Sequence, residues 1–212
     1  MTTDPGLAQP IPPPPPPPPE GSSDEALRVA FIRQDEYSRL LPLVKWLLVI
    51  PQMIVFLLVA IVALFAHLIA FIAVVITRKY PTGLFNFNVG VQRWGLRIGA
   101  YYLLMTDRYP PFSLADDPDY PARLEIDYPA DGTARWRPFF AGILIYPYLI
   151  VGFFVFIAAY FAIIIAFFAI LFTKRFPEGL FNLVSGAMRW QQRANAYSLF
   201  LTTKYPPWRL RA

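Results

Sequence analysis

The strongest constraint on the fold is a segment that occurs twice. Residues 81–111 read PTGLFNFNVGVQRWGLRIGAYYLLMTDRYPP, and residues 177–207 read PEGLFNLVSGAMRWQQRANAYSLFLTTKYPP. They align without a gap at an offset of 96 residues, with 16 of 31 positions identical. A repeat of this period indicates a duplicated domain, in which paired residues should occupy equivalent places. The pairs that form a structural signature are Gly90/Gly186, Tyr101/Tyr197, Tyr109/Tyr205, Pro110/Pro206 and Pro111/Pro207.

Each repeat also contains a long apolar run, over residues 40–76 and 136–172. Both runs are well beyond the roughly 20 residues that cross a bilayer core. Hydrophobic residues make up 56% of the chain and charged residues 16%, whereas soluble domains average about 45–50% and about 25%. The sequence therefore predicts an integral membrane protein.

Shorter patterns predict the other elements. Residues 27–32 and 123–128 alternate polar and apolar side chains, which is typical of short strands. Residues 83–105 and 179–201 place polar side chains at steps of three or four, which predicts amphipathic helices. The predicted fold is an all-α integral membrane protein of two tandem repeats. Each repeat has a short β-strand, a long apolar helix or helical hairpin kinked at proline, and an amphipathic Arg-Trp helix.

Prolines set the expected helix boundaries. Pro42 and Pro138 suit helix starts, while Pro51 and Pro147 lie inside the apolar runs and should kink them. The run of eight prolines at 12–19 predicts polyproline II, either as a spacer or as a ligand for a proline-binding module. The predicted organisation is a proline-rich disordered tail (1–25), membrane repeat 1 (26–112), an acidic linker (113–121), membrane repeat 2 (122–208) and a basic C-terminal end (209–212).

Basic turns at 78–79 and 174–175 suggest the topology. The positive-inside tendency predicts that both are cytoplasmic in a bacterial plasma membrane. Two topologies give this result, each with four crossings. In the first, each apolar run is a helical hairpin and the Arg-Trp helix lies in the interface. In the second, each run is a single long helix and the Arg-Trp helix crosses back. We favour the interfacial placement, because crossing would bury arginines without acidic partners. In a third arrangement each copy crosses once and the copies are inverted.

The repeated arginines and tryptophans are the candidate site. Arginine side chains could bind anionic lipid headgroups as bidentate donors, and indoles concentrate at membrane interfaces. The alternative is plain anchoring, with arginines that extend to water. The lipid-headgroup or interface candidates are Arg93, Trp94 and Arg97 in the first repeat and Arg189, Trp190 and Arg193 in the second.

Other chemistry has little support in the sequence. The chain has no cysteine and one histidine, His67, whose counterpart is Ile163. His67 is either a polar group tolerated between helices or a proton relay or ligand. The sequence contains no catalytic triad, phosphate loop or metal-ligand cluster. We therefore expect no enzyme activity, no cofactor, no metal and no nucleic-acid partner.

Residues 78–112 and 174–208, with YP or FP, LF, RW and YPP at these spacings, resemble a bacterial membrane protein family called domain of unknown function 4389. The resemblance implies a tandem membrane-embedded domain and carries no established activity. We expect a structural or accessory component of a bacterial envelope assembly. The alternatives are a component that binds or transports anionic lipid, and a small pseudo-symmetric channel or transporter. The expected partners are membrane lipids, and a membrane protein or further copies of the chain.

Overall fold

Two long helices, one from each repeat, form an outer layer in the computed structural model, which describes residues 26–210. The first combines α1 (Leu41–Leu48) with α2 (Ile50–Thr77), and the second combines α4 (Arg137–Leu144) with α5 (Tyr146–Thr173). Each spans 37 residues and is long and apolar enough to cross a membrane. The proline-rich tail and the last two residues of the predicted basic end lie outside the described residues.

Each long helix is divided close to a proline. Helix α1 is separated from α2 at Val49, and α4 from α5 at Ile145, and α2 and α5 each have proline in the first turn. Pro51 and Pro147 lack the N–H group that an uninterrupted helix would use. Neither run reverses its direction, so the helical hairpin considered from the sequence is wrong. The first run has no turn-forming residue near its middle, and Gly152, near the middle of the second run, lies within α5.

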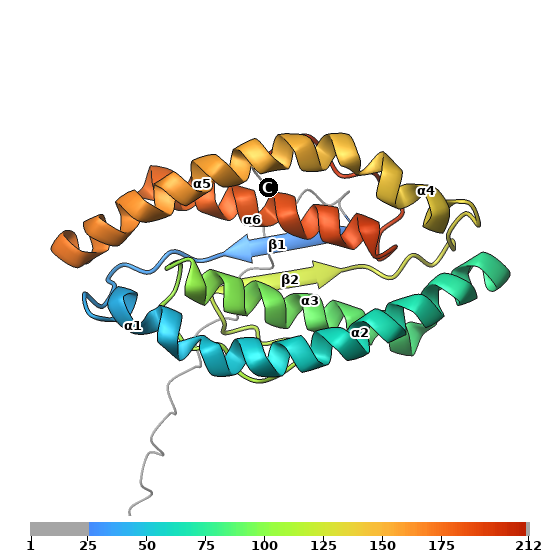
Figure 1. Cartoon of the computed structure of the whole chain (residues 1–212), viewed down its shortest axis with the longest axis horizontal. Helices are drawn as coiled ribbons and strands as arrows, with labels where there is room; N and C mark the ends of the chain where they lie inside the picture. The colour runs from blue at the N-terminus through green and yellow to red at the C-terminus, as the bar shows by residue number, and fades with distance from the viewer. Residues whose placement is uncertain (1–25, 211–212) are drawn as a thin grey trace, which may run out of the picture.

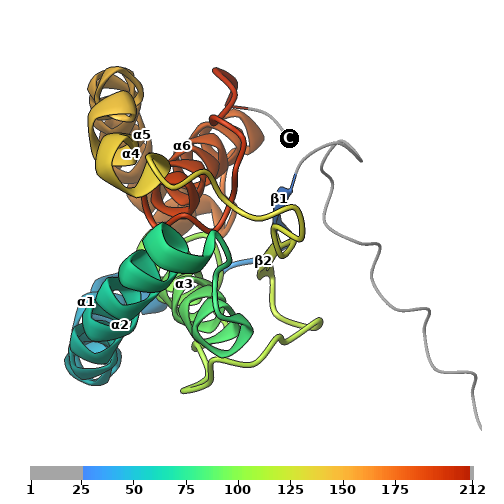
Figure 2. The same ribbon diagram turned by 90° about the vertical axis from the view of Figure 1, so that its right-hand side faces the viewer.

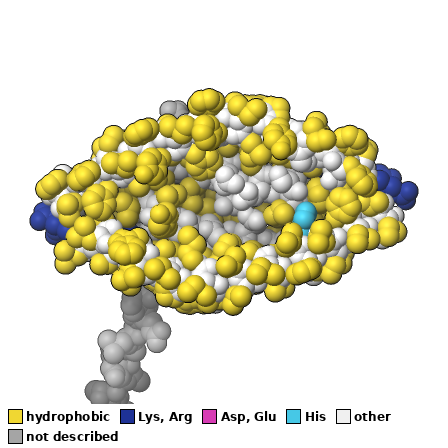
Figure 3. Space-filling view, in the orientation of Figure 1, with side chains coloured by type: hydrophobic (Ala, Val, Ile, Leu, Met, Phe, Trp, Pro, Cys, Tyr) yellow, Lys and Arg dark blue, Asp and Glu magenta, His cyan; other side chains and the backbone are white. Residues whose placement is uncertain are grey.

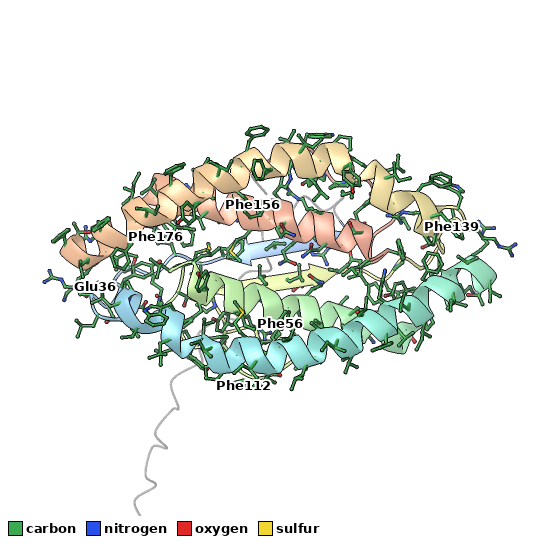
Figure 4. The ribbon with its side chains drawn as sticks, viewed as in Figure 1. Glu36, Phe56, Phe112, Phe139, Phe156 and Phe176 are labelled. Carbon is green, nitrogen blue, oxygen red and sulfur yellow. The ribbon has the colours of Figure 1, made fainter. Side chains whose placement is uncertain are left out.

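The two repeats are antiparallel. Arg39, before α1, donates to the carbonyl oxygen of Phe172 near the end of α5, and Arg135 donates to that of Ile76 in the equivalent place. Glu36, which precedes α1, and Phe176, which follows α5, accordingly lie at the same end of the molecule (Figure 4). The basic turns therefore lie at opposite ends of the long axis (Figure 1). The parallel arrangement of the copies, assumed in both favoured topologies, is wrong.

A two-stranded sheet joins the repeats. Strand β1 (Leu27–Phe31) pairs antiparallel with β2 (Ala122–Ile126), with Val29 opposite Leu124. Both strand predictions are confirmed, although each strand pairs with the other copy. The fold is therefore mostly helical with a small sheet, rather than all-α.

The amphipathic helices form the middle layer. Helices α3 (Thr82–Tyr102) and α6 (Glu178–Ser198) lie between the long helices and the sheet (Figure 2). Their packing crosses the repeat boundary, because Arg93 of α3 donates to the carbonyl oxygen of Leu124 at 2.9 Å, and Arg189 of α6 donates to that of Val29 at 3.2 Å. The main core cluster runs through both repeats, and a smaller cluster around Trp94 lies within the first repeat.

Candidate functional site: the repeated residues and two related pockets

The repeated tryptophans are buried beside the helix kinks. Trp94 Nε1 donates to Gln52 Oε1 at 2.9 Å, and Trp190 Nε1 donates to the carbonyl oxygen of Tyr148 at 3.1 Å. Gln52 and Tyr148 are equivalent positions, one residue after each kink proline. The two tryptophans are only 3% and 4% exposed. The predicted interface anchoring by these indoles is therefore wrong, because they join α3 to α2 and α6 to α5 inside the protein.

Arg97 and Arg193 hold the segments that follow the Tyr-Pro-Pro motifs. Arg97 donates to the carbonyl oxygens of Ser113 and Ala115, at 3.3 and 2.7 Å. Arg193 donates to that of Arg209, the equivalent of Ser113, at 2.6 Å. Arg97 is 2% exposed. All four arginines proposed for headgroups thus bind main-chain carbonyl oxygens of the protein.

The repeated glycines allow these segments to pack closely. A Cβ atom at Gly90 would lie 2.9 Å from the carbonyl oxygen and Cβ of Leu114. At Gly186 the corresponding contacts are with Leu210 at 3.1 Å. Because Leu114 and Leu210 are equivalent positions, the pairs Gly90/Gly186 and Arg97/Arg193 perform the same structural task in both copies.

A buried cation meets each signature tyrosine. Lys45 Nζ lies 5.0 Å from the ring centre of Tyr101 and forms an ion pair of 2.7 Å with Asp107. In the second copy the guanidinium of Arg137 lies 4.7 Å from the ring centre of Tyr197. Arg137 lies four residues, about one helical turn, before the position equivalent to Lys45. Its longer side chain still reaches the equivalent tyrosine ring. The carboxylate is absent there because Thr203 replaces Asp107.

The Tyr-Pro-Pro motifs bind the kinked helices. The hydroxyl groups of Tyr109 and Tyr205 donate to the carbonyl oxygens of Leu48 and Leu144, at 3.3 and 3.2 Å. Next along the chain, the Pro110 carbonyl oxygen accepts from Gln52. The remaining motif prolines share in the same loops: Pro111 and Pro207 accept from main-chain N–H groups two residues on, and Pro206 is buried.

Two pockets of similar size lie between the repeats. The polar pocket, of about 460 Å³, is formed by α2, α3 and α6, and the apolar pocket, of about 480 Å³, is formed largely by α5 and α6. Phe56 lines the first and Phe156 the second (Figure 4). Polar side chains of the first pocket, several matched by apolar ones in the second, are His67, Asn88, Gln92, Gln192 and Asn195.

Sequence reasoning singled out His67 but missed the amides around it. Asn88 and Gln92 lie in the first predicted amphipathic helix, residues 83–105. Gln192 and Asn195 lie in the second, and only the fold brings them beside the first pair. The available signal was the difference between the copies. Aligning at an offset of 96 residues gives the pairs His67/Ile163, Asn88/Val184, Gln92/Met188, Gln192/Leu96 and Asn195/Gly99.

A family profile described as "Domain of unknown function (DUF4389)" matches residues 41–113 and 135–209. Each match begins in or just before the long helix and ends just after the Tyr-Pro-Pro motif, so it contains the repeated arginines, tryptophans and tyrosines described above. The strands lie outside both matches. No curated protein and no solved structure matches the chain.

Proposed function

This chain belongs, through both of its repeats, to the domain of unknown function 4389 family, and we propose that it is a structural membrane protein that lies flat in one leaflet of the bilayer. The outer layer of long helices faces the acyl chains, and the sheet and its charged loops face water. The family description names no activity, so the proposal rests on geometry.

The carrying observation is an extensive exposed apolar surface on the outer layer of long helices. Ile54, Phe65 and Ile72 are each 58–59% exposed along α2, and α5 presents the same kind of surface. The face in Figure 3 is mainly hydrophobic around a central area of other side chains and backbone, with basic groups at the two tips. Among the described residues, no acidic side chain is visible on that face (Figure 3). An exposed apolar surface of this extent favours contact with lipid.

The charges on the sheet argue against a spanning orientation. Arg28 pairs with Asp127 at 2.7 Å, and Arg123 approaches Asp116 at 3.6 Å. These groups belong to the strands or their neighbours, and the sheet lies about halfway along the long axis (Figure 1). If that axis crossed the bilayer, they would lie at its centre, where a charged residue costs about 2.5–3.5 kcal/mol on insertion scales. In the flat orientation they remain in water.

The length of the apolar helices supports the same orientation. A helix of 37 residues is about 55 Å long, whereas the hydrocarbon core is about 30 Å thick. Exposed apolar side chains continue from Leu40 to Ile76 without a polar boundary. A spanning helix would leave apolar turns outside the core, while a flat helix immerses its whole length.

Exposed aromatic residues lie in and directly after both Tyr-Pro-Pro motifs. The loops after α3 and α6 run between the outer layer and the sheet (Figure 2). Their exposed rings suit the headgroup region, where aromatic side chains concentrate. They replace Trp94 and Trp190 as the candidate anchors: Tyr109, Phe112, Tyr205 and Trp208.

The flat orientation also accounts for the basic tips. Arg78 and Lys174 end the two long helices at opposite ends of the molecule, yet both would meet the same membrane surface. We propose that this is the cytoplasmic, anionic surface of a bacterial plasma membrane, which attracts basic residues. The water-facing sheet would then be available to an envelope assembly. A channel or transporter is disfavoured, because a flat chain offers no path across the bilayer.

One-sided labelling in proteoliposomes tests the orientation. Single cysteines at Thr82 and Glu178, which are exposed at opposite ends of the molecule, are treated with an impermeant maleimide. We expect both to react from one side, whereas a cysteine at Leu58 stays unreactive within lipid. Reaction of Thr82 and Glu178 from opposite sides would show that the chain crosses the bilayer.

A further inference from the structure

We propose that the polar pocket binds a neutral lipid whose head group carries a free hydroxyl, of the diacylglycerol type. This inference rests on the proposed function, since the apolar face must meet the bilayer for such a lipid to enter. The occupant follows from the pocket's chemistry, its difference from the apolar pocket, and its opening.

Two buried polar atoms in the pocket have no hydrogen-bond partner. Gln192 is only 8% exposed, and its Oε1 atom is unpaired, as is Nδ1 of His67. Buried polar groups are almost always hydrogen-bonded. An amide oxygen accepts a hydrogen bond, and an imidazole nitrogen accepts or donates one according to its tautomer. A hydroxyl group donates and accepts, so it can satisfy both.

The other polar side chains of the pocket are already engaged. Asn195 donates to Gln92 at 3.3 Å, and Gln191 donates to Asn195 at 2.8 Å. Asn88 contacts the Tyr80 hydroxyl at 3.0 Å. These bonds hold the amides in place around the pocket. They leave Gln192 and His67 as the groups that would meet a ligand.

The apolar pocket indicates that the fold itself does not require this polarity. It has nearly the same volume and an equivalent position, with Ile163 in the place of His67. The duplicated architecture therefore packs well with hydrocarbon at these sites. Polar atoms retained without partners at the equivalent positions point to a molecule that occupies the pocket.

The lining indicates a neutral, amphipathic ligand. None of its residues is charged, so a phosphate group would be buried without a cation, which is unfavourable. Phe56, Ala60, Ala63 and Leu64 of α2 form the hydrocarbon part of the lining. The histidine is visible beside the central hollow of the apolar face (Figure 3). The volume equals that of about fifteen water molecules, enough for a glycerol unit and the first carbons of its chains.

Photocrosslinking in lipid nanodiscs tests the site on the full chain. The probe is dioleoylglycerol with a diazirine in one acyl chain, compared with phosphatidylglycerol carrying the same diazirine. We expect the first probe to label peptides from α2 and α6 around His67 and Gln192 at least five-fold more than the second. Equal labelling by the two probes, or stronger labelling by phosphatidylglycerol, would overturn the proposal.

Competition on the unaltered chain tests the hydroxyl itself. Excess unlabelled dioleoylglycerol should reduce the labelling at least five-fold, whereas its 3-O-methyl ether should not, because the ether cannot donate a hydrogen bond. If both compete equally, the hydroxyl is not recognised and the proposal is wrong. This experiment needs no variant and so does not depend on the folding of one.

A paired variant gives two polar pocket positions the apolar residues of the other copy, Ile163 and Leu96. His67→Ile with Gln192→Leu should lower the diacylglycerol labelling at least five-fold, while the control Ile163→Val with Met188→Leu should leave it unchanged. Labelling that survives the first variant with unchanged helical circular dichroism contradicts the site. If Thr82 and Glu178 react with maleimide from one side but the chain does not bind diacylglycerol, only this inference is wrong. If they react from opposite sides, the proposed function is wrong.

Discussion

The side-chain amide of Asn195 donates a hydrogen bond to the amide oxygen of Gln92 across the boundary between the repeats, over 3.3 Å. The pair at the equivalent positions is Met188 and Gly99, where a Cβ atom on the glycine would lie 2.9 Å from the Met188 methyl carbon. The same contact is therefore polar on one side of the molecule and apolar on the other. The two copies share their structural contacts and differ where they meet.

Arg97 is expected to stabilise the fold rather than bind lipid. Arg97→Gln leaves the Ser113 and Ala115 carbonyl oxygens without their charged donor, and such hydrogen bonds contribute about 1.5–3 kcal/mol each. Thermal unfolding in detergent should show a lowered Tm, while retention of phosphatidylglycerol stays unchanged. Arg108→Gln, at a half-exposed side chain, is the control with little effect. Loss of the anionic lipid with an unchanged Tm would restore the headgroup role.

The close approach at Gly90 predicts a steric effect. Gly90→Ala places a methyl group 2.9 Å from the Leu114 carbonyl oxygen, and overpacking of this kind costs about 1–3 kcal/mol. Gly83→Ala is the matched control on the same helix, because no atom lies within 4 Å of its added Cβ. Alanine favours helix by up to about 1 kcal/mol over glycine, so the control should be neutral or stabilising. Chemical denaturation measures both, and equal effects would contradict the contact.

Lys45 and Asp107 should behave as a coupled pair. The lysine is 1% exposed and its partner lies 2.7 Å away. Lys45→Met removes the cation that pairs with the Asp107 carboxylate. Removing one partner of a buried ion pair lowers the free energy of unfolding by about 3–5 kcal/mol. Adding Asp107→Asn should recover part of that loss in a double-mutant cycle. Strictly additive losses would mean that the two residues act independently.

Alkaline pH should destabilise the fold through its buried tyrosines, of which Tyr37 and Tyr80 are two. Burial raises the pKa of Tyr37 and of Tyr80 to about 12, whereas tyrosine in an unfolded chain titrates near 10. The unfolded state releases these protons first, so stability that is fully present below about pH 10 is lost as the pH rises to about 12, by about 1.4 kcal/mol per pH unit for each residue. The free energy of unfolding, measured by denaturation between pH 10 and 12, should fall less steeply with pH in Tyr37→Phe, because one of the titrating groups is gone. An unchanged slope would show that Tyr37 titrates normally.

The sequence predicted the elements better than their arrangement. Both strands and both amphipathic helices follow from local patterns, and the structure confirms them. The antiparallel packing of the copies depends on contacts between distant segments, such as Arg39 with Phe172. No periodicity within one copy encodes that relation.

The candidate site shows the same division. The repeat identified Arg97 and Trp94 as residues that the architecture uses twice, but not whether they face lipid or the interior. Burial of α3 between two layers decides this, and it makes both residues internal donors. Gln192 carries no repeat signal, since Leu96 occupies its equivalent position. A search for identical residues could only have missed the polar pocket.

Membrane depth along α2 is the most direct test of the flat orientation. Single nitroxide labels at Ile54, Val62, Ile69 and Ile76, all well exposed, report depth in a bilayer through the ratio of oxygen to nickel-chelate accessibility. In the flat orientation all four positions lie at similar depths, within a few ångströms. Depths that descend from one surface to the bilayer centre and rise toward the other would show that the helix spans the membrane, and would contradict the account.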